Sequence, residues 1–401
     1  MKALEGSTST SSAPAMVLNR KTGRSTIELP RTGIKIPYPE VLTIAIDMGG
    51  SKTKAAIMKD GTTIEIFTLP PYVHTEDVPK GASRRLSRQV GSNSVGGISS
   101  LLTATEDSQD EATNDNIVFE RKGKRVSGGK AAGDMGGETG LGQSKLDLLE
   151  EKVIMALIMA GISPDAQFKL SLALPGKQGT FEAEQARVPR LLKRVSWSQD
   201  TGAYNPSAQL IKVVPEGAHG HLYSMLVDPS LPDFSKIKHL NIDGGWRETK
   251  GLAFDTSNLG QPSRTQSGVL EVGINEAYRR VAATIGEPNH ESPEFVAAVN
   301  ESLRLKGEAP KYYVKSLGES VDLWEEAQSV FDDFEEEYIE QAITLIPAGY
   351  HHFCLFGGVM HRYGDVLAEE IEERTSGQCV IMDPYPEYVN VLCQVADLAC
   401  S

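Results

Sequence analysis

The sequence is poor in cysteine, and this argues against several kinds of cross-linked or metal-stapled protein. Its 401 residues contain four cysteines, all near the C-terminal end, with no CxxC pair among them, at positions 354, 379, 393 and 400. That spacing does not favour a zinc site, and a disulfide framework is not expected in so long a chain. We expect free thiols, mostly buried, in a reducing compartment.

Long apolar runs are also missing from the sequence. No run approaches the roughly 20 apolar residues that a helix needs to span a bilayer. Residues 1–25 are rich in Ser and Thr and lack the continuous apolar core of a signal peptide. We therefore expect a cytoplasmic protein with no membrane partner.

Positive charge is in deficit, because the formal net charge is −14. Such a balance argues against a nucleic-acid groove spread over the whole surface, and no direct sequence-specific binding of nucleic acid is expected. Residues 320–346 are locally dense in acid, with nine Asp and Glu, and their apolar residues recur at near-helical spacing. This pattern favours a long helix with a solvated acidic face over a docking site for a basic partner.

The length of the chain predicts more than one structural unit. At 401 residues it exceeds the size that a single hydrophobic core comfortably supports, so two lobes are expected. Residues 1–40 are rich in Ser, Thr, Pro and basic residues and predict a flexible N-terminal tail, with room for short edge strands. A second polar stretch, near residues 74–115, predicts a mobile surface insertion.

Patterned segments fill the rest of the chain. Alternating and β-branched runs predict strands, and apolar periodicity predicts helices. The expected strands are 42–47, 54–59, 63–68, a pair within 116–129, 168–174, 210–214, 237–242, 250–255, 352–356 and 379–382. The expected helices are 146–161, 320–346, 361–375 and a C-terminal one. Strand hairpins followed by helices, twice over, indicate two α/β lobes.

The first candidate site follows a buried strand in LTIAIDMGGSKTKAAIMKDG. Asp47 ends the apolar run, and Gly49, Gly50, Ser51 and Lys52 follow it. Because glycine has no Cβ, the backbone N–H groups of this turn can approach phosphate oxygens. The aspartate would then face a metal ion or its waters. An ordinary β-hairpin with a glycine turn explains the stretch equally well when it is taken alone.

The same arrangement recurs twice more along the chain. In HLNIDGGWRETKGLAFD, Asp243, Gly244 and Gly245 lie between two apolar strands. If each acid-glycine hairpin lies in its own lobe, the two form opposed phosphate-binding jaws. Gly357 and Gly358 lie between a strand and a helix, where a turn without side chains can pass close beneath a nucleoside. Three such turns in this order indicate a nucleotide site.

This order of motifs resembles the actin, hexokinase and heat-shock-70 superfamily of ATPases. The opening DMGGSKTKAA is similar to the ROK sugar kinases, but the Asn-Asp pair and the Cys-rich zinc motif of that family are missing from the sequence. Further segments resemble the plasmid-segregation actins of the ParM and Alp type. They are SGGKAAG (127–133), SLALPGKQ (171–178), VVPEGAHGHLYSML (213–226), SGVLEVGINEAYRR (267–280) and DPYPEYVNVLCQVADL (383–398).

The resemblance implies a fold and its division along the chain. The implied fold is α/β, a two-lobed actin-like (ribonuclease-H-like) ATPase with a nucleotide cleft between the lobes. Lobe I would span residues 41–205 with the insertion near 74–115, and lobe II would span 206–378. Residues 379–401 would return to lobe I. ATP and Mg²⁺ are the implied cofactors.

Roles for single residues follow from the same resemblance. Asp47 and Asp243 would lie on either side of a nucleotide-bound Mg²⁺, mostly through water. Glu216 matches the catalytic acid of the family, which orients or deprotonates the water that attacks the γ-phosphate. The other interpretation of Glu216 is a helix-start acid stabilised by the macrodipole. Ser51 or Lys52 would reach the β-phosphate.

The remaining implied nucleotide contacts are small residues. They are Gly49, Gly50, Gly244, Gly245, Ser267, Gly268, Gly273, Gly357 and Gly358. The second phosphate motif departs from the family pattern, because Trp246 and Arg247 stand where small hydroxyl residues are usual. Either Arg247 holds the γ-phosphate, or both side chains point outward to a filament neighbour.

Three functions stay open at this stage. The first is a filament-forming ATPase that polymerises with bound ATP and moves or positions DNA through a DNA-binding adaptor protein. The second is a small-molecule kinase of the same superfamily, acting on a sugar. The third is a nucleotide-binding scaffold with little hydrolysis, which the bulky Trp246 favours.

Overall fold

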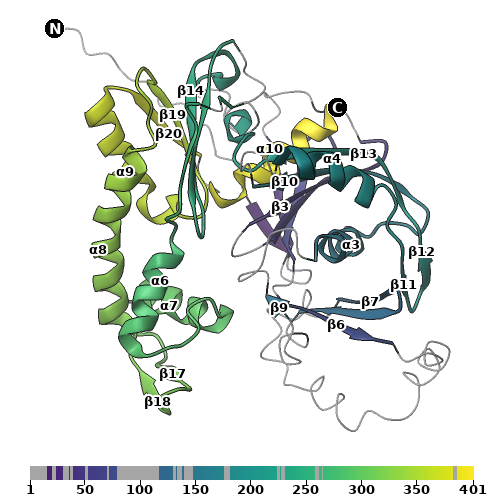
Figure 1. Cartoon of the computed structure of the whole chain (residues 1–401), viewed down its shortest axis with the longest axis horizontal. Coiled ribbons are helices and arrows are strands. Elements are labelled where there is room, and N and C mark those ends of the chain that lie inside the picture. Colours follow the sequence, from purple (N-terminus) through teal and green to yellow (C-terminus); the bar gives the residue numbers. More distant parts are fainter. Residues whose placement is uncertain are drawn as a thin grey trace.

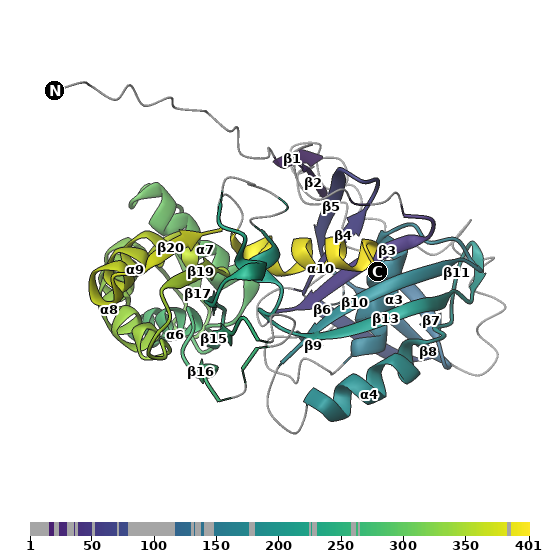
Figure 2. The same ribbon diagram turned by 90° about the horizontal axis from the view of Figure 1, so that it is seen from above.

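A computed structural model describes most of the chain. The described residues are 16–19, 24–29, 36, 39–49, 53–69, 72–78, 117–129, 132, 138–139, 148–175, 181–223, 226, 231–257, 262–263, 265–382 and 386–401. Most of the expected insertion and the turn residues 50–52 therefore lie outside them. Two lobes stand side by side, with the C-terminal helix between them (Figures 1 and 2).

The first lobe is built on a seven-stranded mixed sheet. In spatial order its strands are β1 (Met16–Asn19), β2 (Arg24–Glu28), β5 (Thr63–Thr68), β4 (Thr53–Met58), β3 (Leu42–Met48), β10 (Gln167–Leu174) and β13 (Ser207–Pro215). The strands β3, β4 and β5 form the antiparallel meander expected from the sequence, and β10 runs parallel to both β3 and β13. The central strands are buried on both faces, as their near-continuous apolar sequences require.

A second sheet of the first lobe packs on the far side of the helix α3 (Leu149–Met159) (Figure 1). Its strands, in spatial order, are β12 (Gly202–Tyr204), β11 (Trp197–Gln199), β7 (Ile117–Arg121), β8 (Lys124–Gly128), β6 (Tyr72–Asp77) and β9 (Glu138–Thr139). Phe119 and Val126 of this sheet share one hydrophobic core with α3 and with Leu170 and Leu172 of β10. The helix α4 (Phe181–Leu192) lies before β11 in the chain and packs against β13.

In the described ranges the second lobe has a five-stranded sheet covered by the helices α6 to α9. Its strands, in spatial order, are β16 (Gly268–Leu270), β15 (Thr249–Phe254), β14 (His239–Gly244), β19 (His352–Phe356) and β20 (Gln378–Ile381). The helices are α6 (Asn275–Ile285), α7 (Pro293–Leu305), α8 (Trp324–Ile343) and α9 (Met360–Thr375). A short hairpin of β17 (Tyr312–Val314) and β18 (Glu319–Val321) joins α7 to α8. The 3₁₀ helices are η1 (Gly220–Leu222), η2 (Phe234–Lys236) and η3 (Pro386–Tyr388).

The C-terminal helix α10 (Val389–Ala399) connects the two lobes (Figure 2). It packs against β3, β4 and β10 of the first lobe, and its core also contains Cys354 and Phe356 of β19 in the second lobe. Helix α10 therefore lies against lobe I, whereas residues 379–381 of the implied return belong to β20 in the second-lobe sheet. Strand β13 belongs to the first-lobe sheet, although the resemblance implied lobe II for residues 206–378. None of the helices in the described ranges is both long and apolar enough to cross a bilayer.

The helix expected at 320–346 is shorter than predicted. Residues 319–321 form β18 instead, after a turn at Gly318, whose φ of +71° favours glycine. The backbone N–H of Trp324 donates to Asp322 Oδ1 at 3.0 Å, and α8 begins there. Phe331, Phe334 and Tyr338 are buried while the acids between them are mostly exposed, as a solvated outer face requires.

The four cysteines are free, as expected from their spacing. Cys354 and Cys393 are buried, Cys379 is partly buried and Cys400 is exposed. Burial raises the pKa of each thiol above its ordinary value. None of them is therefore activated as a nucleophile.

The prediction of a flexible tail over residues 1–40 is wrong for β1 and β2. Strand β2 pairs antiparallel with β5, with Ile27 opposite Ile64, and Ile27 is fully buried. Arg24 donates to Glu65 at 2.6 Å and lies over the Phe67 ring, 5.6 Å from its centroid. The short edge strands allowed by the sequence thus cover an edge that β5 would otherwise expose.

The burial of Ile27 predicts a clear loss of stability on truncation. Ile27→Ala should lower the free energy of unfolding by about 2–5 kcal/mol, the usual cost of an aliphatic truncation in a core. Glu28→Ala on the same strand is the matched control, because Glu28 is exposed, and it should change stability by less than about 0.5 kcal/mol. Urea unfolding measures both. Equal stabilities of the two variants would show that β2 does not belong to the core.

Candidate functional site

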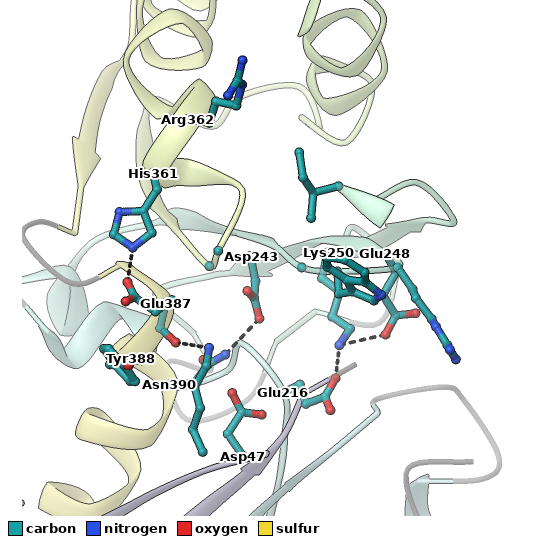
Figure 3. A pocket seen from close by; sticks show the side chains of 18 of the residues that line it. Asp47, Glu216, Asp243, Glu248, Lys250, His361, Arg362, Glu387, Tyr388 and Asn390 are labelled. Carbon is teal, nitrogen blue, oxygen red and sulfur yellow. Dashed lines mark hydrogen bonds and ion pairs between the residues drawn. The ribbon is translucent and has the colours of Figure 1, made fainter. Parts of the chain in front are cut away.

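A cleft of about 700 Å³ lies between the lobes. Its walls combine residues that follow β3 and β13 of the first lobe with residues of the β14–β15 and β19–α9 turns of the second. The three glycine turns expected from the sequence therefore meet in one place. Figure 3 shows Asp47, Glu216 and Asp243 facing the same space from different elements.

The first hairpin places an acid and a base side by side. Asp47 is the penultimate residue of β3, is 6% exposed, and pairs in register with Lys54 on β4. The Nζ of Lys54 donates to the backbone carbonyl of Glu387 at 2.5 Å and lies 5.5 Å from the centre of the Tyr388 ring. Gly49 lines the cleft. Because Gly50, Ser51 and Lys52 lie outside the described residues, their expected phosphate contacts stay predictions.

The second hairpin repeats this arrangement in the other lobe. Asp243 pairs in register with Lys250, and Asn390 of α10 donates to Asp243 Oδ2 at 3.0 Å. Burial raises the pKa of the Asp243 carboxyl above its usual range, although Lys250 and the Asn390 hydrogen bond oppose this. The N–H of Gly245 donates to Glu248 O at 3.0 Å and closes the turn. A Cβ on Gly244 would lie 2.8 Å from Val359 Cβ, so the position needs glycine.

The third turn packs directly on the second hairpin. A Cβ on Gly357 would lie 2.4 Å from Gly244 O and 2.6 Å from Asp243 Oδ1, and the φ of Gly357 is +95°. Only glycine fits there. Gly358, in contrast, lines the cleft with nothing within 4 Å of its Cβ position. Its backbone therefore borders open space, as a turn beneath a bound nucleoside would.

Three further predicted contacts, Ser267, Gly268 and Gly273, do not line the cleft. The hydroxyl of Ser267 accepts from the Ala253 N–H at 3.0 Å, and Gly268 faces Leu345. Gly273 packs against the backbone of the second hairpin, because its Cβ position lies 2.4 Å from Trp246 O. These three residues hold the second hairpin and the β15–β16 edge in place, and the cleft itself is lined by others.

Glu216 lies at the floor of the cleft in an ion pair with Lys250. It follows β13, is 3% exposed, and a turn over residues 216–219 separates it from η1. Lys250 also lies 3.0 Å from Glu248. Burial alone would lower the pKa of Lys250, but the carboxylates of Glu216, Glu248 and Asp243 raise it well above its usual value. The ammonium is therefore charged and bridges two carboxylates.

Trp246 and Arg247 both line the cleft. The Trp246 ring packs on Tyr278 with centroids 4.9 Å apart, and the Arg247 guanidinium donates to both carboxylate oxygens of Glu291 at 2.9 and 3.0 Å. Trp246 therefore packs inward against α6, whereas the side chain of Arg247 is 36% exposed. The ion pair with Glu291 holds Arg247 beside the site.

The sequence analysis missed both lysines of the cleft, although a signal for them exists. Lys54 and Lys250 each follow their aspartate by seven residues. In a two-stranded hairpin with a tight turn, that spacing puts the two side chains opposite each other, as the registers show. Glu387 and Asn390 could not be found in this way, because η3 and α10 bring them from the end of the chain.

Comparison with known proteins identifies the fold. No family model and no curated protein matches the sequence. The solved structure of the archaeal actin homolog Ta0583 is 18% identical, with 90% of this chain and 100% of that chain covered and a TM-score of 0.61. The actin-like protein Alp7A is 14% identical over 89% of this chain and 95% of that chain, with a TM-score of 0.61.

Filament structures are among the similar folds. A 15-stranded ParM filament from Clostridium botulinum is 16% identical over 90% of this chain and 99% of that chain, with a TM-score of 0.60. The chain thus has the two-lobed actin-like fold, and the fold prediction is confirmed. Ta0583 has also been solved in complex with ADP, at 17% identity and a TM-score of 0.59, with 90% of this chain and 98% of that chain covered.

The carboxylates of the cleft fit a cation that is bound mainly by the phosphates of a nucleotide. In the described part of the chain, no group of three or more His, Cys, Asp or Glu side chains could hold a metal ion directly. Asp47 and Asp243 nevertheless face one space, and Asp243 is a buried carboxylate whose charged form is disfavoured by burial. A Mg²⁺ that keeps its waters and is bound chiefly by phosphates would stabilise that charge.

The open space at Gly358 predicts a selective binding defect. Gly358→Val should fold normally, because nothing lies within 4 Å of the Cβ position, but the side chain should fill the cleft. The Kd for ATP should rise at least about tenfold, equivalent to ~1.4 kcal/mol. Calorimetric titration with Mg-ATP measures this.

Gly364→Ala on α9 is the matched control. A Cβ there makes only ordinary contact with Met360 Cβ at 3.4 Å, on a helix that begins just after the glycine turn. It should leave the Kd unchanged. Equal ATP affinities of the two variants would contradict a nucleotide at Gly358.

Proposed function

We propose that this protein is a filament-forming actin-like ATPase that polymerises with bound ATP and Mg²⁺. The observation that carries the proposal is the pair of Asp–Lys glycine hairpins, one from each lobe, that face a single cleft with Glu216 at its floor. The similarity in fold to a ParM filament structure supports self-assembly. A role in segregating or positioning plasmid or other DNA, through a DNA-binding adaptor, completes the proposal.

Each cleft residue takes a role in this proposal. Backbone N–H groups of the turns at Gly49–Gly50 and Gly244–Gly245 would bind phosphate oxygens, except that of Gly245, which donates to Glu248 O. Ser51 or Lys52 would lie at the β-phosphate. The turn at Gly357–Gly358 would lie beneath the nucleoside. When bound between Asp47 and Asp243, Mg²⁺ would neutralise the developing charge on the phosphates.

Hydrolysis in this proposal depends on Glu216. A water molecule beside its carboxylate would attack the γ-phosphorus, and the bond from that phosphorus to the bridging oxygen would break. Glu216 would take a proton from the water, which leaves ADP and inorganic phosphate. A general base of this kind typically contributes about 10² to 10⁴ to the rate.

One observation favours a second candidate, a nucleotide-binding scaffold with slow hydrolysis. Glu216 is engaged by Lys250 in the structure, and a carboxylate in an ion pair is a weaker general base. Light scattering after addition of Mg-ATP separates the two functions. A rise followed by decay supports a dynamic filament, a rise that persists supports the scaffold, and no rise contradicts both.

The role of Glu216 predicts a separation of assembly from hydrolysis. Glu216→Gln should bind ATP and assemble, because the phosphates are held elsewhere, but phosphate release should slow by about 10² to 10⁴. Its polymer should therefore persist after wild-type polymer has decayed. Sedimentation and phosphate release, measured over time, test this. Variant polymer that decays as quickly as wild-type polymer would place the general base at another residue.

Replacing Asp243 by asparagine should abolish ATP turnover but increase the relative stability of the protein at higher pH. Asp243→Asn should abolish turnover, because the cation loses a charged partner. The pKa of Asp243 is raised in the folded state, so the wild-type protein loses stability as pH rises from the usual carboxyl range through that raised value. The asparagine cannot ionise and does not incur this loss. Urea unfolding at several pH values should therefore show that the free energy of unfolding of the variant increases relative to that of the wild-type protein as pH rises. Turnover at the wild-type rate by the variant would refute the assignment of Asp243 as a partner of the cation.

A further inference from the structure

A buried lysine joins the two lobes at the floor of the cleft. Lys250 lies on β15 of the second-lobe sheet, and its partner Glu216 follows β13 at the edge of the first-lobe sheet. The side chains are 8% and 4% exposed. Their ion pair therefore spans the boundary along which the lobes would move.

The environment of this pair makes it costly to break. Water is largely excluded from both side chains, so neither charge can be solvated if the other leaves. A second interlobe hydrogen bond lies beside it, in which Asn241 Nδ2 donates to Gly217 O at 2.9 Å. Residues 216 and 217 are thus tied to the second lobe through a side chain on each of two adjacent strands, β14 and β15.

Lys250 has another carboxylate within reach. Glu248 lies 3.0 Å from Lys250 on the same hairpin, so it moves together with the lysine, whereas Glu216 belongs to the other lobe. Figure 3 shows the lysine between the two glutamates. If Glu216 withdraws, the ammonium keeps a partner, and the buried charge is not stranded.

We propose that Lys250 is a positioning residue for the proposed hydrolytic acid, and that it passes from Glu216 to Glu248 when the lobes rearrange. In the structure, where Lys250 is paired with both glutamates, the ammonium holds Glu216 in place and occupies its carboxylate. In the rearranged state Glu248 retains the ammonium, and Glu216 is released to accept a proton from water. The rate of hydrolysis would thereby depend on the relative position of the lobes. This inference rests on the proposed ATPase function.

The exchange of partners predicts a catalytic role for a residue that need not touch the nucleotide. Glu248→Gln removes the second carboxylate with no change in shape, so Lys250 should remain on Glu216. We expect kcat for ATP hydrolysis to fall about tenfold while the Kd for ATP stays within about twofold. Glu150→Gln is the matched control, because its side chain is 17% exposed, close to the 20% of Glu248, and is paired with Arg121 and Lys122 away from the cleft. It should leave both quantities unchanged.

Lys250→Met tests the positioning role itself. Because Lys250 must leave Glu216 before hydrolysis, the variant should hydrolyse ATP at least as fast as the wild-type protein with an unchanged Kd for ATP, and adding it to Glu216→Gln should cause no further change, because residues that act as a unit are not additive. The interlobe pair also has a readout without nucleotide. Glu216→Gln and Lys250→Met combined should unfold at no lower urea concentration than the less stable single variant.

The outcomes separate this inference from the function on which it rests. A wild-type protein that does not hydrolyse ATP refutes the proposed function. Wild-type hydrolysis with an unchanged kcat in Glu248→Gln refutes the exchange of partners. A Kd for ATP that rises at least tenfold in Lys250→Met would make the lysine a phosphate ligand and overturn its positioning role. Should Lys250→Met fail to fold, the Glu248→Gln comparison alone decides.

Discussion

The cost of burying carboxylates organises this molecule. Asp47, Glu216 and Asp243 converge on one cleft and are each at most 9% exposed, where an unpaired negative charge is strongly disfavoured. Lys54 and Lys250 offset part of that charge from fixed positions in the two hairpins. The raised pKa of Asp243 shows that the compensation there is incomplete. A cation that arrives with a phosphate ligand would complete it, so the same imbalance favours binding.

Close backbone packing keeps these charges in place. The turn at Gly357 lies against the second hairpin so tightly that a single methyl group would collide with Gly244 and Asp243. The Val359 N–H donates to Gly244 O at 3.0 Å and ties α9 to the same hairpin. On the other side, α10 carries Asn390 to Asp243 while it packs on the sheet of the first lobe. The second hairpin is thus anchored to both lobes.

Much of this arrangement could be predicted from the sequence. The glycine turns and the strands before them could be predicted because glycine and β-branched residues have strong local preferences. The two-lobed actin-like fold was implied by the resemblance of their order to a known superfamily. The placement of Asp47, Glu216 and Asp243 around one cleft also agrees with the expectation. The edge strand β2 was underestimated, since its stability comes from pairing with β5 rather than from its own composition.

Other features depend on tertiary contacts that no local pattern encodes. Ser267 and Gly268 are small residues like the glycines of the cleft. However, β16 pairs with β15 at the edge of the sheet, so these two residues do not line the cleft. The partner of Glu216 was missed because a lysine on a strand ordinarily indicates a solvated face, and only the approach of the lobes buries Lys250. Arg247 was expected either at a phosphate or at a neighbour, and it is held by Glu291, 44 residues away in the sequence.

The central claim is that one nucleotide is held between the two hairpins. Electron cryomicroscopy of the protein with Mg²⁺ and a non-hydrolysable ATP analogue tests this most directly. We predict phosphates between residues 47–54 and 243–250, a cation between Asp47 and Asp243, and the nucleoside on the turn at Gly357–Gly358. A nucleotide bound outside this cleft, or one that contacts a single hairpin, would contradict the claim.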